Sequence, residues 1–324
     1  MSTAPKYYFR DTKGAGSDPN AKAGSDNNDG LTDKTAKQNY TTLLSLVGSV
    51  PAGTELFVAN SCGFAQTSSF RFSSNNAVSI IDTIEFDGTH VICTIAKPCN
   101  MTVGQNFNVK GANQAAVNGL VTVAEISADT KTFKYIPNGT PTNPIDIDTD
   151  WHNAIRFDGG LIKIKTYTSS EFVAQNKAPP LVEYNDSSHA QHRMDGNGAF
   201  GSITWQGISY KYKGALIGSP SCFFTYYQGK DSITLDDLKI DGFRMAAYPN
   251  NKGGGGVNDF TMINCEVVNN WYQGLMGNPD FSLIAGNFFG NNGHNNSSGG
   301  TDKLHNVYLS ECHHTRFIDN ELTE

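Results

Sequence analysis

The chain has 324 residues, 33 of them glycine, a net charge of −7 and only 17% charged residues. This length could build one elongated domain or two domains. The acidic balance argues against a nucleic-acid partner. No apolar run reaches the roughly 18 residues that a membrane span needs, so we expect no membrane insertion. The abundance of Asn, Ser, Thr, Tyr and Gly suits a hydrogen-bonding, carbohydrate-like ligand.

The start of the chain has neither the charged nor the apolar region of a signal peptide. Six cysteines are scattered, and none has C-x-x-C spacing. They predict free thiols in a chain made in a reducing compartment, such as a host cytoplasm.

The first 60 residues predict a short strand, a polar loop, a helix and a second strand, in that order. Apolar residues recur at helical spacing between positions 39 and 50, and residues 51–54 (PAGT) end the helix. The loop at Asp26–Asp29 has the oxygen density of a calcium site without its spacing, so the alternatives are a structural cation and an ordinary turn. We predict no other cofactor. The apolar residues of the helix are Tyr40, Leu43, Leu44 and Val47.

This order, "GSDNNDGL", an amphipathic helix and "PAGTELFV", resembles the opening of right-handed parallel β-helix proteins. Polysaccharide lyases, pectate-lyase-like proteins and bacteriophage tailspikes share it. The resemblance implies that the helix caps the open end of the first coil, covering backbone and apolar groups that would otherwise face water.

Residues 78–157 interrupt this pattern with short β-segments that predict an inserted small antiparallel β domain. The segments "MTVGQNFNVKGA", "VNGLVTV" and "TKTFKYI" resemble a small β module of phage tail and tailspike proteins. The alternative is a generic β insertion in a secreted bacterial enzyme.

The last third of the chain repeats one sequence pattern, which predicts a strand, a polar corner and a second strand. We align Ile263, Ile284 and Ile318, with Leu235 before them, and predict a solenoid with a fixed core and variable loops. The predicted fold is all-β: a right-handed parallel β-helix with an N-terminal capping helix and an inserted antiparallel domain. The predicted divisions are residues 1–77, 78–157 and 158–324. Because the sequence stops at Glu324 directly after a repeat, we expect a fragment or an end covered by partner chains, and the resemblance implies a homotrimer.

Two swollen loops, at residues 244–258 and 290–304, occupy equivalent places in the repeat and should form the walls of a groove. Aromatic, basic and polar residues in or near these loops are the candidate substrate-binding residues. They are Arg244, Tyr248, Trp271, Tyr272, His294 and Glu311.

Glycosidic cleavage needs a proton donor and a base or nucleophile, which carboxylates commonly supply. Equivalent positions on neighbouring coils lie about 4.8 Å apart, and the separations over one and two coils bracket those of retaining and inverting enzymes. We predict Glu266 as the acid and Asp237 as the base, at repeat positions that differ by one. The alternative is that these carboxylates are solvated at coil corners.

A second candidate pair is His305 and Tyr308 in "HNVYLS", which with "CHHTRFIDNE" resembles a strand of β-helix proteins that act on polysaccharides. Either residue could remove the proton α to a uronate carboxylate while Arg244 or Arg316 neutralises that carboxylate. The alternative is that both only hydrogen-bond within a coil. We predict no metal site, since the adjacent His313 and His314 would point to opposite faces of a strand.

The residues and resemblances together predict a phage tailspike-like receptor-binding protein of the virion tail. It would bind and depolymerise a bacterial surface polysaccharide, by hydrolysis or by elimination, and could contact other phage tail proteins. One alternative is a non-catalytic carbohydrate-binding adhesin or tail assembly module. Another is a secreted bacterial polysaccharide lyase.

Overall fold

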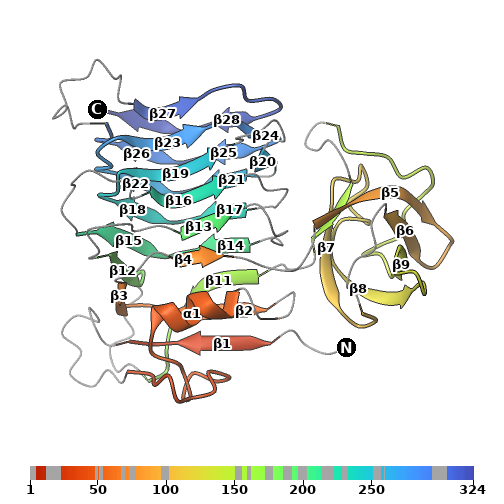
Figure 1. Cartoon of the computed structure of the whole chain (residues 1–324), viewed down its shortest axis with the longest axis horizontal. Coiled ribbons are helices and arrows are strands. Elements are labelled where there is room, and N and C mark those ends of the chain that lie inside the picture. Colours follow the sequence, from red (N-terminus) through yellow and green to blue (C-terminus); the bar gives the residue numbers. More distant parts are fainter. Residues whose placement is uncertain are drawn as a thin grey trace.

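The structure, a computed structural model, consists of a tall stack of β-strands with a smaller barrel beside it (Figure 1). Three long sheets, called sheets A, B and C below, run through the stack. The structure describes residues 5–11, 23–47, 50, 54–66, 70–72, 78–95, 102–149, 155–158, 162–171, 178–184, 192–195, 203–213, 222–227, 233–250, 257–258, 260–293 and 305–324.

Strands from successive turns of the chain lie side by side in each sheet. Sheet A contains β1 (Lys6–Phe9), β2 (Glu55–Ala59), β11 (Ile162–Tyr167), β14 (Ile203–Gln206), β17 (Ile233–Asp236), β21 (Phe260–Ile263), β25 (Leu283–Ala285) and β28 (Arg316–Ile318). Sheet B contains β3 (Gly63–Gln66), β12 (Leu181–Tyr184), β15 (Ser209–Tyr212), β18 (Lys239–Asp241), β22 (Glu266–Val268), β26 (Phe288–Gly290) and β29 (Glu321–Thr323). Sheet C contains β4 (Phe70–Phe72), β13 (His192–Asp195), β16 (Cys222–Tyr227), β19 (Met245–Asn250), β23 (Gln273–Gly277) and β27 (His305–Leu309).

The chain visits sheets A, B and C in turn and then starts the next coil. Strands β2, β3 and β4 form one such coil, and β11, β12 and β13 form the next, after the barrel. The strand pairs within the three sheets are parallel. A short parallel pair, β20 (Val257–Asn258) and β24 (Pro279–Asp280), joins two coils between sheets C and A. This topology confirms the predicted parallel β-helix.

The core of the solenoid is set by the alternation of side chains along each strand. Leu235 and Ile284 occupy the same inward row of sheet A, and both are fully buried. Ile263 and Ile318 both pair with Ala285 and are only partly buried. The predicted alignment of Ile263 and Ile318 with Ile284 is therefore wrong by one residue. A shift of one moves a side chain to the other face of a strand.

The corner between sheets A and B explains which residues follow the first strand of each coil. Asp237, Asn264 and Gly286 take equivalent places there with φ of 52°, 55° and 63°. Gly, and to a lesser extent Asn and Asp, tolerate this left-handed conformation. Each backbone N–H donates to a carbonyl of the next coil, as Asp237 does to Ile263 at 3.0 Å. The left-handed backbone conformation therefore explains why a short polar residue occupies position 237.

Helix α1 (Tyr40–Val47) lies beside β3 at the first coil. The side-chain hydroxyl of Tyr40 hydrogen-bonds that of Tyr210 inside the core, with an O–O distance of 2.6 Å. The helix therefore covers the interior of the solenoid as a cap, as predicted. Its four predicted inward residues are all buried: Tyr40, Leu43, Leu44 and Val47. Within the described residues, no helix is long and apolar enough to cross a membrane.

The barrel lies in the sequence between β4 and β11 and is closed by antiparallel pairings. It has a hydrophobic core of its own, in which the Phe107 ring makes edge-to-face contacts with Phe133, Tyr135 and Phe157. The insertion is therefore an antiparallel β domain, in agreement with the predicted fold class. Its strands are β5 (Val78–Phe86), β6 (Val91–Ile95), β7 (Asn106–Lys110), β8 (Gly119–Ile126), β9 (Thr132–Tyr135) and β10 (Arg156–Asp158).

Asparagine side chains connect the last coils internally. The amide of Asn270 donates to Asn292, and the amide of Asn292 donates to Asn306, both at 2.8 Å. A second ladder joins Asn287 to Asn320, also at 2.8 Å. Because these amides also bind backbone groups, they fix one coil against the next.

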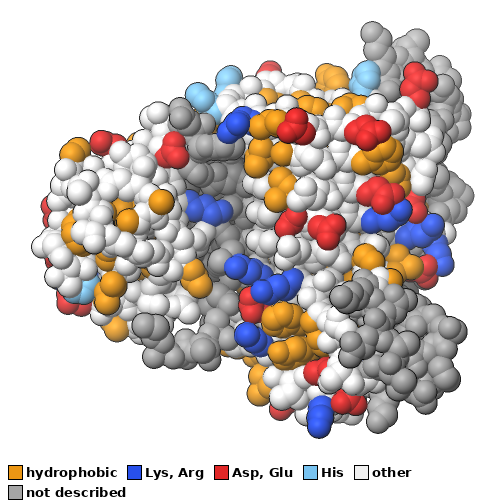
Figure 2. Space-filling model, turned by 180° about the vertical axis from the view of Figure 1, so that it is seen from behind, with side chains coloured by type: hydrophobic (Ala, Val, Ile, Leu, Met, Phe, Trp, Pro, Cys, Tyr) orange, Lys and Arg blue, Asp and Glu red, His pale blue; other side chains and the backbone are white. Residues whose placement is uncertain are grey.

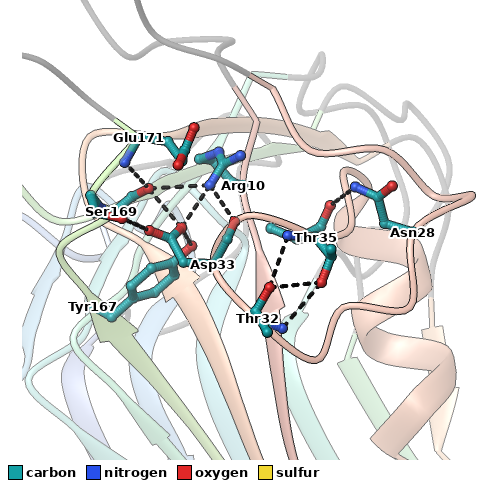
Figure 3. Close-up of polar contacts among 10 residues, drawn as sticks. Arg10, Asn28, Thr32, Asp33, Thr35, Tyr167, Ser169 and Glu171 are labelled. Carbon is teal, nitrogen blue, oxygen red and sulfur yellow. Dashed lines mark hydrogen bonds and ion pairs between the residues drawn. The ribbon is translucent and has the colours of Figure 1, made fainter.

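A polar network ties the N-terminal segment to the strand that follows the barrel (Figure 3). Arg10 donates through Nη1 to Oδ1 of Asp33 at 2.6 Å. The same carboxylate accepts hydrogen bonds from the hydroxyls of Tyr167, Ser169 and Ser170 at 2.7–2.8 Å. Arg10 is only 3% exposed, so this carboxylate is ion-paired with a buried guanidinium.

Candidate functional site

The densest group of predicted ligand-binding residues lies where the chain passes from sheet B into sheet C. Arg244 directly precedes β19, and Trp271 and Tyr272 directly precede β23 in the next coil. The guanidinium carbon of Arg244 lies 5.7 Å from the ring centroid of Trp271 and 4.9 Å from that of Tyr272. All three side chains are partly buried. The structure thus joins three predicted residues in one cation–π cluster.

The backbone holds this Arg244 cluster in place. The N–H groups of Tyr272 and Gln273 both donate to the carbonyl of Arg244, at 3.0 and 3.2 Å. The N–H of Trp271 donates to the carbonyl of Phe243 at 3.0 Å. The N–H of Phe243 in turn donates to the buried amide of Asn270, in the first asparagine ladder. The cluster is therefore connected by hydrogen bonds to the first asparagine ladder.

Three polar side-chain atoms around this corner are buried without a hydrogen-bond partner among the described residues. They are Nε of Arg244, Nε1 of Trp271 and Oε1 of Gln273. Gln273 is only 4% exposed, and the sequence prediction did not include it. The sequence gives little indication that Gln273 is important, because a single glutamine at the start of a strand is common. A buried polar group usually finds a partner, so this corner has unused hydrogen-bonding capacity.

The outer face of sheet C carries a second group of predicted residues. Val307 and Leu309 pack against the core, so Tyr308 between them faces outward and is 45% exposed. Tyr308 pairs with Met276 of the preceding coil. The ring of His305 stacks on that of Tyr308, with centroids 5.7 Å apart and planes 13° apart.

Tyr248 and Met276 extend this outer face down the solenoid. Ala247 pairs with Leu275, and both are buried in the core, so the next residue of each strand, Tyr248 or Met276, faces outward. With Tyr308 they form an outward row over three coils. Met276 was not predicted from the sequence, because a methionine at strand spacing is usually a core residue.

The two predicted catalytic carboxylates lie elsewhere, on sheet B and its corner with sheet A. Glu266 pairs with Lys239, and its carboxylate lies 2.5 Å from the ammonium nitrogen. Asp237 is exposed at the corner and aligns with Asn264, two positions before Glu266 rather than one. Burial and the neighbouring Asp236 raise the pKa of Asp237. The catalytic roles of Glu266 and Asp237 stay predictions.

The remaining predicted residues are dispersed. Glu311 is exposed just beyond β27, in a left-handed conformation, and His294 lies outside the described residues. His313 interacts with Asp280, and its backbone N–H lies 2.7 Å from a carboxylate oxygen. Among the described residues, no group of three or more His, Cys, Asp and Glu side chains could hold a metal ion.

The oxygen-rich loop near the helix uses its carboxylates in hydrogen bonds. Asp26 accepts the backbone N–H of Asn39 at 3.0 Å, just before α1 begins. Asp29 accepts the backbone N–H of Leu31 at 2.9 Å and the hydroxyl of Thr35 at 2.7 Å. These contacts are typical of a helix cap and a turn, and a structural cation here stays a prediction.

A further patch lies at the N-terminal end of sheet A. Figure 2 shows hydrophobic side chains and Lys or Arg side chains side by side toward the lower end of the solenoid. The rings of Tyr8 and Phe57 stack at 5.1 Å, and the ammonium groups of Lys6 and Lys165 lie 5.9 and 5.3 Å from the Phe57 centroid. Because these neighbours cover the faces of Phe57, the patch is less suited to stacking on a sugar than sheet C is.

No protein-family model and no curated protein sequence matches this chain. Solved structures with a distant similarity include two phage tailspikes, each at 10% sequence identity. One is the tailspike protein gp49 from Pseudomonas phage LKA1, with a TM-score of 0.31, covering 83% of this chain and 46% of that chain. The other is the Gp54 tailspike of Acinetobacter baumannii bacteriophage AP22 in complex with A. baumannii capsular saccharide, with a TM-score of 0.25, covering 88% and 56%. This chain therefore spans about half the length of each.

Proposed function

We propose that this protein is a tailspike-like receptor-binding protein that binds a bacterial surface polysaccharide, capsule or O-antigen, and cleaves its glycosidic bonds. The observation that carries the proposal is the clustering of Arg244, Trp271 and Tyr272 at one corner of a rigid β-helix. Sugars present apolar C–H faces and many hydroxyls, and aromatic rings with a polar edge match both. Binding residues are most effective when a rigid scaffold places them.

The outward row of sheet C supports binding of a long, chain-like ligand. Tyr248, Met276 and Tyr308 stand on three successive coils, about 4.8 Å apart from one coil to the next. A chain of sugars could run along this face and pass the Arg244 cluster. A small ligand would need only one such contact.

We propose two cleavage schemes, of which the positions of the residues favour elimination. Tyr308 and His305 lie on the same sheet that the Arg244 cluster borders, whereas Glu266 and Asp237 lie on sheet B and its corner with sheet A. In the elimination, Tyr308 or His305 takes the proton α to the uronate carboxylate. The glycosidic C–O bond then breaks, a double bond forms in the sugar, and the leaving oxygen gains a proton. Hydrolysis by Glu266 and Asp237 is the second candidate.

The protein would act outside the host cell as part of a virion tail, as a homotrimer and beside other tail proteins. A non-catalytic adhesin or tail assembly module would use the same face for binding alone. A secreted bacterial polysaccharide lyase would share the elimination chemistry.

The test is to incubate the purified protein with capsular polysaccharides and lipopolysaccharides from a range of bacteria and to follow chain length. Shorter products that absorb ultraviolet light as unsaturated uronates support elimination. Shorter products with new reducing ends and no such absorbance support hydrolysis. Binding without shortening leaves only the adhesin, and no binding to any polysaccharide contradicts the proposal. Trp271→Ala should weaken binding, whereas Tyr8→Ala, in the patch at the other end of the solenoid, should not.

A further inference from the structure

We infer that the Arg244 cluster is a subsite for a carboxylate-bearing sugar, so the bound polysaccharide is acidic and contains a hexuronate or a related sugar acid. This inference rests on the proposed saccharide binding and adds the chemical class of the ligand.

The first argument is charge. Among the described residues, the guanidinium of Arg244 has no carboxylate partner, and it lies over the rings of Trp271 and Tyr272. Two lysines of sheet B do have such partners. Lys211 is paired with Asp241, and Lys239 with Glu266. A partly buried cation held by aromatic rings alone favours an anionic ligand.

The second argument is geometry. A guanidinium that lies over a ring keeps its N–H groups in its own plane, where they can donate sideways. A carboxylate accepts two such parallel hydrogen bonds, which makes the contact both strong and directional. A hydroxyl of a neutral sugar would accept only one of them and would leave the positive charge unmatched.

The third argument is the set of unpartnered atoms at this corner. Nε of Arg244 and Nε1 of Trp271 are donors, and Oε1 of Gln273 is an acceptor. An unsatisfied buried group costs about 1–3 kcal/mol, so a ligand that draws these side chains slightly outward and satisfies them recovers that free energy. A sugar acid brings both kinds of group, carboxylate oxygens for the donors and ring hydroxyls for the glutamine.

The fourth argument is preorganisation. The backbone at Arg244 is bonded to Tyr272 and Gln273, and the preceding Phe243 is bonded to the buried Asn270. The cluster therefore loses little conformational freedom when a ligand binds. A single guanidinium also matches the single charge of a carboxylate better than the higher charge of a phosphate monoester.

The experiment compares each polysaccharide of the bacterial panel in its native form and after chemical reduction of its carboxyl groups to alcohols. Carboxyl reduction leaves phosphate groups in place, so the comparison separates the two anions. The variants are Arg244→Lys, which keeps the charge but loses the planar fork, and Arg244→Met. Lys211→Met is the matched control for loss of a positive charge, on sheet B.

We expect the wild-type protein to bind an acidic polysaccharide about tenfold or more tightly than its reduced form. Arg244→Met should remove this preference and Arg244→Lys, which keeps the charge, should reduce it, while both retain weak binding to the reduced form. Lys211→Met should keep the preference. Equal binding of native and reduced forms, or a preference abolished by Arg316→Met and not by Arg244→Met, would overturn the inference and leave saccharide binding intact. No binding to either form would instead refute the proposed function.

Discussion

Nη1 of Arg10 lies 2.6 Å from Oδ1 of Asp33, and two side chains from beyond the barrel, Tyr167 and Ser169, converge on the same carboxylate. The polypeptide leaves the solenoid for about 80 residues of barrel and returns to this contact. The network therefore closes the first coil around the insertion. The network and helix α1 therefore both hold the first coil of the solenoid in place.

Asp33→Ala should destabilise the solenoid by about 3 kcal/mol, because it removes a carboxylate that is ion-paired with the buried guanidinium of Arg10 and accepts three hydroxyl hydrogen bonds. Urea unfolding followed by tryptophan fluorescence measures the change. Glu183→Gln is the matched control, since Glu183 pairs with Lys213 at a much more exposed site. That change should cost about 0.5 kcal/mol or less. Equal effects of the two variants would contradict the assigned role of Asp33.

The same carboxylate should make stability depend on pH. Burial acts to raise the pKa of Asp33, but hydrogen bonds from Ser169, Ser170 and Tyr167 together lower it below its ordinary value of 3.8. Because the folded-state pKa is the lower one, the contribution is complete above about pH 4 and is lost as the pH falls through the folded-state pKa. The unfolding free energies of the wild-type protein and Asp33→Asn should therefore converge in acid. A difference that stays constant down to that range would contradict the shift.

The asparagine ladders should carry more stability than their exposed counterparts. Asn287 is 2% exposed and binds the backbone of Cys265 and Met262 as well as the amide of Asn320. Asn287→Ala leaves these groups unsatisfied and should cost about 2–4 kcal/mol. Gln206→Ala, which removes an exposed amide hydrogen bond to Asp236, should cost under about 1 kcal/mol. Thermal unfolding of both variants tests the difference.

The two cleavage schemes predict opposite outcomes for two conservative substitutions. Tyr308→Phe removes the proposed base of the elimination, and Glu266→Gln removes the proposed acid of the hydrolysis. If elimination operates, Tyr308→Phe should lower the rate at least about a hundredfold with little change in binding, and Glu266→Gln should not. The reverse pattern would support hydrolysis. Measuring binding and product formation on one polysaccharide separates lost chemistry from lost affinity.

The solenoid could be predicted from the sequence because its repeats are local and periodic. The inward residues of α1 were identified by their helical spacing, and the strands of the barrel by their apolar segments. The alignment of Ile263 with Ile284 failed because two apolar residues stand side by side in these repeats. Only the coil-to-coil register shows which one faces the core.

The candidate site could be predicted only in part. The sequence indicates Arg244, Trp271 and Tyr272 only as separate candidates, because their contact depends on how two coils stack. Gln273 was missed because its importance comes from burial, which a single polar residue does not reveal in a sequence. Asp237 and Glu266 were placed one position apart, since the left-handed corner that separates them has no unique sequence signal.

Asp237 allows stability and catalysis to be separated in one substitution. Its φ of 52° suits asparagine better than aspartate, and burial together with Asp236 raises its pKa, so the folded state disfavours its charge. Asp237→Asn should therefore stabilise the protein by roughly 0.5 kcal/mol at neutral pH. Because the folded-state pKa is raised, the part of this gain that comes from the charge is complete above that pKa and disappears as the pH falls below the unfolded value.

The same variant tests the hydrolytic base. If Asp237 takes a proton during cleavage, Asp237→Asn should be more stable and inactive. This combination is expected where a charge that destabilises the folded state is needed for catalysis. If Asp237 only shapes the corner, Asp237→Asn should be more stable and fully active. Asn264→Asp, which makes the reverse change at the same corner one coil later, is the matched control and should lower stability without changing cleavage. Unfolding curves across pH and product formation on one polysaccharide distinguish these outcomes.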